Sequence, residues 1–107
     1  MPKFVPIASG SSGNCCFFES ENTKIIIDAG ISCKKIKDAL NSIGVSETDI
    51  DAVLITHEHI DHVKGLGVLS RKFNIPVYAT KGTWNNMPDS VGNIQVCNKF
   101  VVSNQGF

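Results

Sequence analysis

The sequence predicts a fold of the α/β or α+β class in which helices flank a mixed β-sheet. Three short apolar runs, each typical of a β-strand, lie near the amino terminus and are separated by turn-forming residues. From residue 52 onward, strand-like runs alternate with a helical pattern, which favours parallel strands. A chain of 107 residues is long enough for one small domain with a modest core.

The three amino-terminal strands are predicted at residues 4–7, 15–18 and 24–27. The first contains Pro6, which cannot donate a backbone hydrogen bond and therefore favours an edge position in the sheet. Residues 21–22 are predicted to connect the second and third strands as a hairpin. The third run is continuously apolar, and we expect such a strand to be covered on both faces.

A helix is predicted next, from Ser32 as its N-cap to about Ile43, with Gly44 as its C-terminal stop. Ile36 and Leu40 are four residues apart, and Ile43 lies seven residues after Ile36. This spacing places the three side chains on one face of the helix and predicts that this face contacts the core.

The rest of the sequence predicts a second series of strands and helices. These are a capped turn at residues 46–49, a strand at 52–55, a helix at about 63–73, a strand at 76–79, a short helical stretch from residue 82 that ends before Pro88, and an apolar run at 100–102. Gly65 and Gly67 weaken the helix at 63–73 but permit close packing of neighbouring segments against it.

The charge balance gives no sign of a nucleic-acid or membrane surface. Lys plus Arg and Asp plus Glu both number 10, so the formal net charge is zero and no basic footprint is visible. No apolar run approaches membrane-spanning length, and the first residues lack the charged-then-apolar pattern of a signal peptide. A cytoplasmic location is therefore the default expectation.

The four cysteines do not predict a disulfide framework. They are Cys15, Cys16, Cys33 and Cys97, and none forms a C-x-x-C pair. Cys33 precedes two lysines that could lower the pKa of its thiol. The alternative is an unreactive cysteine on the face of a helix.

The densest chemical signal is a cluster of metal-ligand side chains directly after the strand predicted at 52–55. All three histidines of the protein lie there, in the order His57, Glu58, His59, Ile60, Asp61, His62. If the strand continues in extended form to His59, then His57 and His59 point to the same side, and Asp61 and His62 point elsewhere. Donors that point two ways indicate parts of two neighbouring sites for zinc or a similar divalent ion.

The cluster has two other interpretations. The helical zinc-protease motif His-Glu-x-x-His would require a second histidine at position 61, where the residue is Asp61. The cluster could also be a group of surface histidines with no metal. Three imidazoles and an aspartate at this spacing rarely mean that, which favours a metal site.

Residues 56–62 followed by Gly65 resemble the His-x-His-x-Asp-His signature of the metallo-β-lactamase fold. The stretches at 9–14 and 25–33 are similar to the YycJ (WalJ) branch of that family, which comprises bacterial cytoplasmic metal-dependent hydrolases regarded as DNA exonucleases. The resemblance implies an αββα sandwich, two β-sheets between helices, built from two comparable halves. The chain is similar to the first half only, so residues 1–107 are expected to be the N-terminal portion of an incomplete domain.

The resemblance also implies roles for the individual residues. His57 and His59 would hold a first divalent ion, zinc or manganese, and Asp61 and His62 would serve a second, with Asp61 also orienting the nucleophile. Asp28 would brace the histidine loop without binding metal; a turn-forming aspartate before glycine is the alternative. No residue after His62 matches the family's remaining ligands.

A glycine- and serine-rich turn is the candidate for a second binding role. Its residues Ser11, Ser12, Gly13 and Asn14 could offer backbone N–H groups to a phosphate. The alternative is that this turn is only a tight connection between strands.

Three functions are open at this point. The first is a metal-dependent phosphodiesterase that acts on DNA as an exonuclease, in which a metal-bridged hydroxide attacks phosphorus. The second keeps the fold and the two metals but hydrolyses a thioester, a lactone or a β-lactam. The third is a catalytically inactive, metal-binding fragment that needs a missing C-terminal half or associates with itself.

Overall fold

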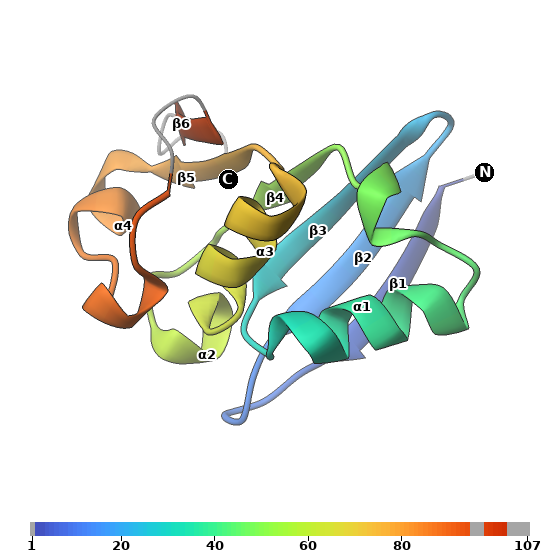
Figure 1. The fold of residues 1–107 in the computed structure, drawn as a ribbon, viewed down its shortest axis with the longest axis horizontal. Coiled ribbons are helices and arrows are strands. Elements are labelled where there is room, and N and C mark those ends of the chain that lie inside the picture. Colours follow the sequence, from blue (N-terminus) through green and yellow to red (C-terminus); the bar gives the residue numbers. More distant parts are fainter. Residues whose placement is uncertain (1, 95–97, 103–107) are drawn as a thin grey trace.

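The computed structural model of the protein describes residues 2–94 and 98–102, and these residues form a six-stranded sheet (Figure 1). The strands lie in chain order and are β1 (Lys3–Ala8), β2 (Cys15–Ser20), β3 (Thr23–Ala29), β4 (Ala52–Leu54), β5 (Val77–Thr80) and β6 (Lys99–Val102). Strands β1, β2 and β3 pair antiparallel, whereas β3, β4, β5 and β6 pair parallel. The predicted mixed sheet with flanking helices is therefore confirmed.

The amino-terminal strands follow the sequence pattern closely. β1 lies at one edge of the sheet, as Pro6 predicted. β2 and β3 form the predicted hairpin, and Glu21 at its turn has a φ of 51°, a left-handed conformation suited to a tight reversal. The apolar run at 100–102 also forms a strand, β6, at the opposite edge.

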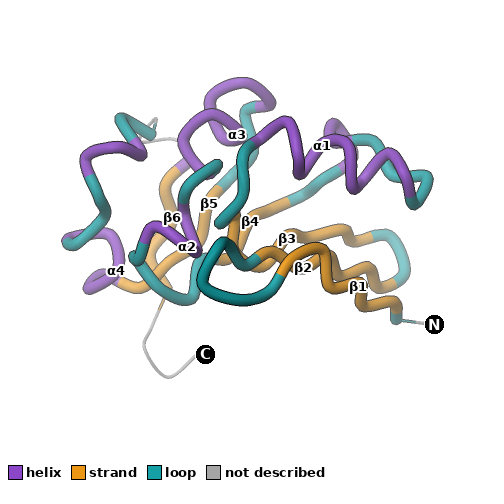
Figure 2. Tube along the Cα trace, turned by 90° about the horizontal axis from the view of Figure 1, so that it is seen from below, coloured by secondary structure: helices purple, strands orange, loops and turns teal. Residues whose placement is uncertain are grey.

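The helices α1 (Cys33–Ser42) and α3 (Leu66–Phe73) cover one face of the sheet (Figure 2). Beneath them lies a row of register partners that are fully buried: Phe17, Ile26, Val53 and Val77. Burial of each such side chain contributes roughly 1.5–3 kcal/mol relative to exposure. The core of the described residues therefore lies between the sheet and these two helices.

Among the described residues, β3 is covered on one face only and not on both faces as expected. Ile26 is fully buried, but its neighbours Ile25 and Ile27 are only half-buried. Side chains alternate between the two faces of a strand, so Ile25 and Ile27 point to the face away from α1 and α3. The continuous apolar run thus marks a sheet with one helix-covered face and one open apolar face.

Helix α1 has the boundaries that its capping residues predicted. The Ser32 hydroxyl accepts a hydrogen bond from the backbone N–H of Lys35, and Gly44 follows the helix with a φ of 79°. Ile36 and Leu40 are fully buried, as their spacing predicted. The turn predicted at 46–49 is the 3₁₀ turn η1 (Glu47–Asp49), capped by Ser46.

The prediction of a single helix at 63–73 is wrong, because the structure has two separate helices in this region. α2 (Ile60–Val63) ends before Gly65, and α3 begins at Leu66. The backbone N–H of Gly65 donates to the carbonyl of Ala29 at 2.8 Å instead of continuing the helix. A Cβ atom at position 65 would lie 2.1 Å from the carbonyl oxygen of Ile31, so only glycine permits this close approach.

The remaining elements lie at the β6 side of the sheet. The predicted helical stretch before Pro88 is α4 (Lys81–Asn85), and a further 3₁₀ turn, η2 (Asp89–Val91), had no predicted counterpart. The indole N–H of Trp84 donates to the carbonyl of Phe100 and ties α4 to β6. Cys97 lies outside the described residues, whereas Cys15, Cys16 and Cys33 are free thiols. In the described ranges, no helix is long and apolar enough to cross a membrane.

Candidate metal centre

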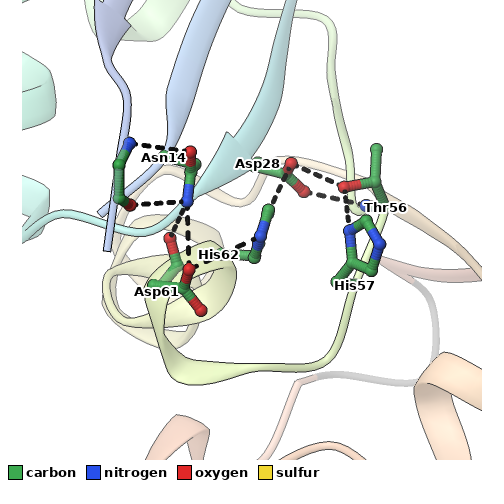
Figure 3. Close-up of polar contacts among 7 residues, drawn as sticks. Asn14, Asp28, Thr56, His57, Asp61 and His62 are labelled. Carbon is green, nitrogen blue, oxygen red and sulfur yellow. Dashed lines mark hydrogen bonds and ion pairs between the residues drawn. The ribbon is translucent and has the colours of Figure 1, made fainter. Parts of the chain in front are cut away.

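Asp28 and the histidine-rich segment meet where the carboxyl ends of the parallel neighbours β3 and β4 lie side by side (Figure 3). β4 ends at Leu54, and Ile55 still donates its backbone N–H to the carbonyl of Tyr78. The next N–H, that of Thr56, donates to a carboxylate oxygen of Asp28 at 2.8 Å. The chain therefore leaves the sheet at Thr56, and β4 does not continue to His59.

Asp28 is a buried carboxylate, with 6% of its surface exposed. Its Oδ1 accepts from the Thr56 backbone, and its Oδ2 accepts from the Thr56 hydroxyl at 2.7 Å and lies 2.8 Å from Nδ1 of His62. These partners compensate the cost of removing the charge from water. Asp28 also has a φ of 63°, a left-handed conformation that costs about 1 kcal/mol or more for a residue other than glycine.

The hydrogen bonds define which ring nitrogen of His62 is available. A carboxylate only accepts hydrogen bonds, so Nδ1 of His62 carries the proton that it shares with Asp28. The Nε2 atom of the neutral ring then has a free lone pair. This atom lies 3.7 Å from Oδ2 of Asp61, so an imidazole and a carboxylate donor face the same small volume.

His57 has the same tautomer for a related reason. The Thr56 hydroxyl has one proton, which it donates to Asp28, so its contact of 2.9 Å with Nδ1 of His57 requires the proton to be on the ring. The Nε2 atom of the neutral His57 ring is therefore also free. An imidazole whose Nδ1–H donates to an oxygen partner is the usual arrangement of a metal-bound histidine.

The alternation argument expected His62 to point away from His57 and His59, but the rings of His57 and His62 are close neighbours. The centroids of His57 and His59 are 6.3 Å apart, whereas those of His57 and His62 are 4.7 Å apart. The reason is that the strand ends at Leu54, so period-two alternation does not apply to residues 57–59. His59 instead occupies the N-cap position of α2 and is exposed.

The donor chemistry of the cluster fits a divalent ion, but the set is not a complete site. The free Nε2 atoms and the Asp61 carboxylate are donors that zinc and similar ions accept. Among the described residues, no group of three or more His, Cys, Asp or Glu side chains converges in a way that could hold a metal ion. Further donors or a rearrangement of the loop would be needed to complete it.

The serine- and glycine-rich turn lies beside Asp61. Two of its backbone N–H groups donate within the protein: Gly13 to the carbonyl of Gly10, and Asn14 to the carbonyl of Asp61 at 2.6 Å. Ser11 and Ser12 are exposed. The phosphate-binding role of this turn stays a prediction, and for Gly13 and Asn14 it would require N–H groups that already have partners.

Sequence reasoning missed the contacts that Thr56 and Asn14 make. The side-chain amide of Asn14 donates to the carbonyl of Asp61 and lies 3.1 Å from its Oδ2, although the two residues are 47 positions apart. Thr56 precedes the histidines directly, and its hydroxyl was the available signal. Gly30 was another, because a Cβ atom there would lie 1.8 Å from the carbonyl oxygen of Asp61.

Burial favours the protonated form of two cysteines, Cys15 and Cys33. Burial, reinforced by Cys16 and Asp28, raises the pKa of the Cys15 thiol to about 12. Burial also raises the pKa of Cys33, and this effect exceeds the opposing effect of Lys72 and Lys37. The lowered pKa that sequence reasoning allowed for Cys33 is therefore wrong.

A cavity of about 250 Å³ lies elsewhere, between α4, η2 and the start of β6. Trp84, Met87 and Ile94 form part of its lining, and Asp89 and Lys99 contribute charged groups. None of its lining residues belongs to residues 57–62. The cavity is therefore separate from the histidine cluster.

Comparison with known proteins gives a consistent set of similarities. Residues 8–96 match the family described as the metallo-beta-lactamase superfamily. The chain is 43% identical over 100 residues to an exodeoxyribonuclease YycJ from Bacillus anthracis and 48% identical over 88 residues to an exodeoxyribonuclease WalJ from Streptococcus pneumoniae. These matches cover 94% and 82% of the chain.

Among solved structures, the fold is similar to that of the Rm3 metallo-beta-lactamase, with a TM-score of 0.73 and 22% sequence identity over 95% of the chain. The chain spans 38% and 33% of the lengths of the two exodeoxyribonucleases and 42% of the length of the Rm3 enzyme. The similarity thus includes nearly all of this chain but less than half of each relative.

Proposed function

Because this chain belongs to the metallo-β-lactamase superfamily, we propose that it supplies part of the metal centre of a hydrolase that cleaves phosphodiester bonds in DNA as an exonuclease. The observation that carries the proposal is the identity of 43% and 48% to two proteins named as exodeoxyribonucleases, over 94% and 82% of the chain. The likeness to the Rm3 enzyme is at 22% identity and supports the fold alone.

The residues proposed to hold the metal are His57, His59, Asp61 and His62. Two divalent ions, zinc or manganese, would activate water as a nucleophile and neutralise charge on the phosphodiester oxygens when bound. The free Nε2 atoms of His57 and His62 support this assignment. A catalytic zinc has three protein ligands plus water, so two ions need ligands beyond these four residues.

Asp28 and Thr56 are proposed to hold protons in place for the donor atoms. Asp28 accepts the Nδ1–H of His62, which keeps that proton away from Nε2. The Thr56 hydroxyl donates a hydrogen bond to Asp28 and accepts one from the Nδ1–H group of His57. One buried carboxylate thus orients two imidazoles, one directly and one through a hydroxyl group.

Residues 1–107 are proposed to be the N-terminal portion of a metallo-β-lactamase domain. The described residues form one sheet with α1 and α3 on one face. The half-buried Ile25 and Ile27 point to the other, open face. We propose that this arrangement is half of an αββα sandwich, whose other half would cover that face. A DNA substrate and a cytoplasmic location belong to the same proposal.

A second function is favoured by one observation. No three metal-ligand side chains of the described residues converge, so the 107-residue chain by itself could be an inactive fragment that binds metal weakly. This alternative keeps the fold and the ligand residues and removes catalysis. Hydrolysis of a thioester, lactone or β-lactam has no specific support from the geometry of the site.

The test is a substrate panel with a chelator control. The 107-residue chain, supplied with Zn²⁺ or Mn²⁺, is incubated with 5′-phosphorylated single-stranded DNA and with a thioester, with and without EDTA. EDTA-sensitive release of nucleotides that is lost in His59→Ala and kept in Asn41→Ala, an exposed position of α1, supports the nuclease. Thioester hydrolysis without DNA cleavage would eliminate it, and metal binding without any turnover would favour the inactive fragment.

A further inference from the structure

We propose that Asn14 is a positioning residue that holds the Asp61 carboxylate beside His62, so that the two side chains meet a metal ion as a fixed pair. This inference rests on the proposed function, since it takes Asp61 and His62 as metal ligands. It assigns to the serine- and glycine-rich turn a structural task at the metal centre in place of phosphate binding.

The first support is the set of bonds made by the Asn14 side chain (Figure 3). Its Nδ2 atom lies 3.0 Å from the carbonyl oxygen of Gly10, 3.2 Å from that of Asp61 and 3.1 Å from Oδ2 of Asp61. Its Oδ1 accepts from the backbone N–H of Gly10 at 3.2 Å. The amide has two protons, so one serves the turn at Gly10 and the other is shared between the two oxygens of Asp61.

The second support is the backbone around Asp61. In a continuous helix, the carbonyl of Asp61 would accept from the N–H of Gly65, but that group donates to Ala29. The Asp61 carbonyl accepts instead from the backbone N–H of Asn14 at 2.6 Å, and the carbonyl of Asn14 accepts from Gly30. The early end of α2 thus frees the group by which Asn14 anchors Asp61.

The third support is that His62 and Asp61 are each held by a hydrogen bond with a neighbouring side chain. Asp28 orients His62 through Nδ1, and Asn14 orients Asp61 through Oδ2, which leaves Nε2 of His62 and Oδ2 of Asp61 3.7 Å apart. An amide is a neutral donor, so it directs the carboxylate without neutralising the charge that a cation requires. A lysine or arginine in its place would compete with the metal ion.

The serine- and glycine-rich turn has limited capacity for phosphate binding. The N–H groups of Gly10, Gly13 and Asn14 all donate to oxygens of the protein, to the Asn14 side chain, Gly10 and Asp61 respectively. A phosphate would have to displace those contacts. Of these bonds, the one from the Asn14 N–H already holds Asp61, and this favours the positioning role.

The test uses the 107-residue chain with Co²⁺ as the probe, because its visible absorption reports both affinity and ligand geometry. Two variants are compared: Asn14→Ala, which removes all the side-chain bonds, and Asn14→Leu, which keeps the approximate size of the side chain but has neither a donor nor an acceptor. Asn41→Ala is the matched control. Both Asn14 variants are expected to weaken Co²⁺ binding by about tenfold to hundredfold and to shift the absorption bands, while the control does neither.

A purely structural role for the turn would lower the melting temperature without changing the Co²⁺ spectrum of the protein that stays folded. If the wild-type chain binds Co²⁺ and both Asn14 variants bind it with unchanged affinity and spectrum, the inference about Asn14 is overturned. The proposed function is not affected by that result. If the wild-type chain takes up no Co²⁺, it is the metal-binding proposal that fails. The NMR resonances of the Asn14 side-chain amide in metal-free protein then decide: they must move in Asp61→Ala and stay in Asn41→Ala.

Discussion

The Nδ1 atom of His62 lies 2.8 Å from Oδ2 of Asp28, a carboxylate that is 6% exposed and belongs to a different segment of the chain. The same oxygen accepts from the Thr56 hydroxyl, whose own oxygen contacts Nδ1 of His57. A single buried carboxylate therefore sets the tautomer of two imidazoles in the histidine cluster. This relationship supports several tests that do not depend on the identity of the substrate.

The Asp28→Asn substitution tests the direct bond. Asparagine tolerates the left-handed backbone at this position, so the change mainly removes the negative charge that accepts the His62 proton. We expect metal affinity to fall by about tenfold to hundredfold and the free energy of unfolding to fall by about 1–3 kcal/mol. Metal content by native mass spectrometry and urea denaturation measure the two effects. Asp38→Asn, at an exposed position of α1, is the control and should change neither.

The substitutions Thr56→Val and Thr56→Ser test the hydrogen bonds that connect Asp28 to His57 through the Thr56 hydroxyl. Valine keeps the shape of threonine but removes the hydroxyl, so it leaves Asp28 with one partner fewer and His57 without its Nδ1 partner. We expect Val to weaken metal binding by about tenfold or more and Ser to keep it within a few-fold of wild type. Isothermal titration with Zn²⁺ distinguishes them. Weakening by Ser but not by Val would mean that the methyl group, not the hydroxyl, matters, and equal weakening by both would show that the hydroxyl alone does not account for the effect.

The Gly30→Ala substitution tests the close contact between β3 and α2. A Cβ atom at position 30 would lie 1.8 Å from the carbonyl oxygen of Asp61, so the two segments must separate. We expect a loss of about 2 kcal/mol or more in the free energy of unfolding, because backbone atoms cannot move aside as a flexible side chain does. Gly82→Ala in α4, where nothing lies within 4 Å of the new atom, is the control and should leave stability unchanged or raise it by up to about 1 kcal/mol. Thermal unfolding of both variants is the measurement.

Local chemistry in the sequence predicted much of the fold. The Ser32 cap, the Ile36 and Leu40 stripe, the edge proline Pro6 and the hairpin turn at Glu21 each act within a few residues, and the structure has each one. The helix predicted at 63–73 failed because Gly65 donates to Ala29, a residue distant in the sequence. A helical period cannot reveal that a long-range acceptor interrupts it.

In the candidate site, too, the sequence predicted the local features but not the long-range contacts. The histidines and Asp61 are visible as ligand types because they stand together in the sequence, but their pairing depends on where β4 ends. That end is determined by the bond from Thr56 to Asp28, 28 positions earlier. The contact of Asn14 with Asp61 likewise depends on tertiary packing. In the sequence, only Gly30 indicates that another segment approaches the backbone there.

The raised pKa of the Cys15 thiol predicts that the stability of the protein depends on pH in the alkaline range. Burial first, then Cys16 and Asp28, raise its pKa from 9.0 to about 12, so the folded protein keeps the proton over a range in which the unfolded chain has lost it. The stability that the neutral thiol provides is fully present below pH 9.0 and falls as the pH rises from 9.0 toward about 12. Urea denaturation of wild type across this range should show an additional slope of up to about 1.4 kcal/mol per pH unit relative to Cys15→Ala. Parallel curves for the two proteins would contradict the prediction.

The open face of the sheet predicts self-association of the 107-residue chain. Phe4 on β1 is 57% exposed and Phe100 on β6 is 40% exposed, and the half-buried Ile25 and Ile27 lie between these two edges. An apolar face of this kind is typical of a surface that another protein surface covers. We expect light scattering to report dimers or larger species, and Phe100→Lys to shift the distribution toward monomer. Val68→Lys, which replaces a 49% exposed residue of α3 on the helical side, is the control that should leave the distribution unchanged. A wild-type chain that remains monomeric at high concentration would show that this face is stable in water without a partner, and would count against residues 1–107 being half of a sandwich.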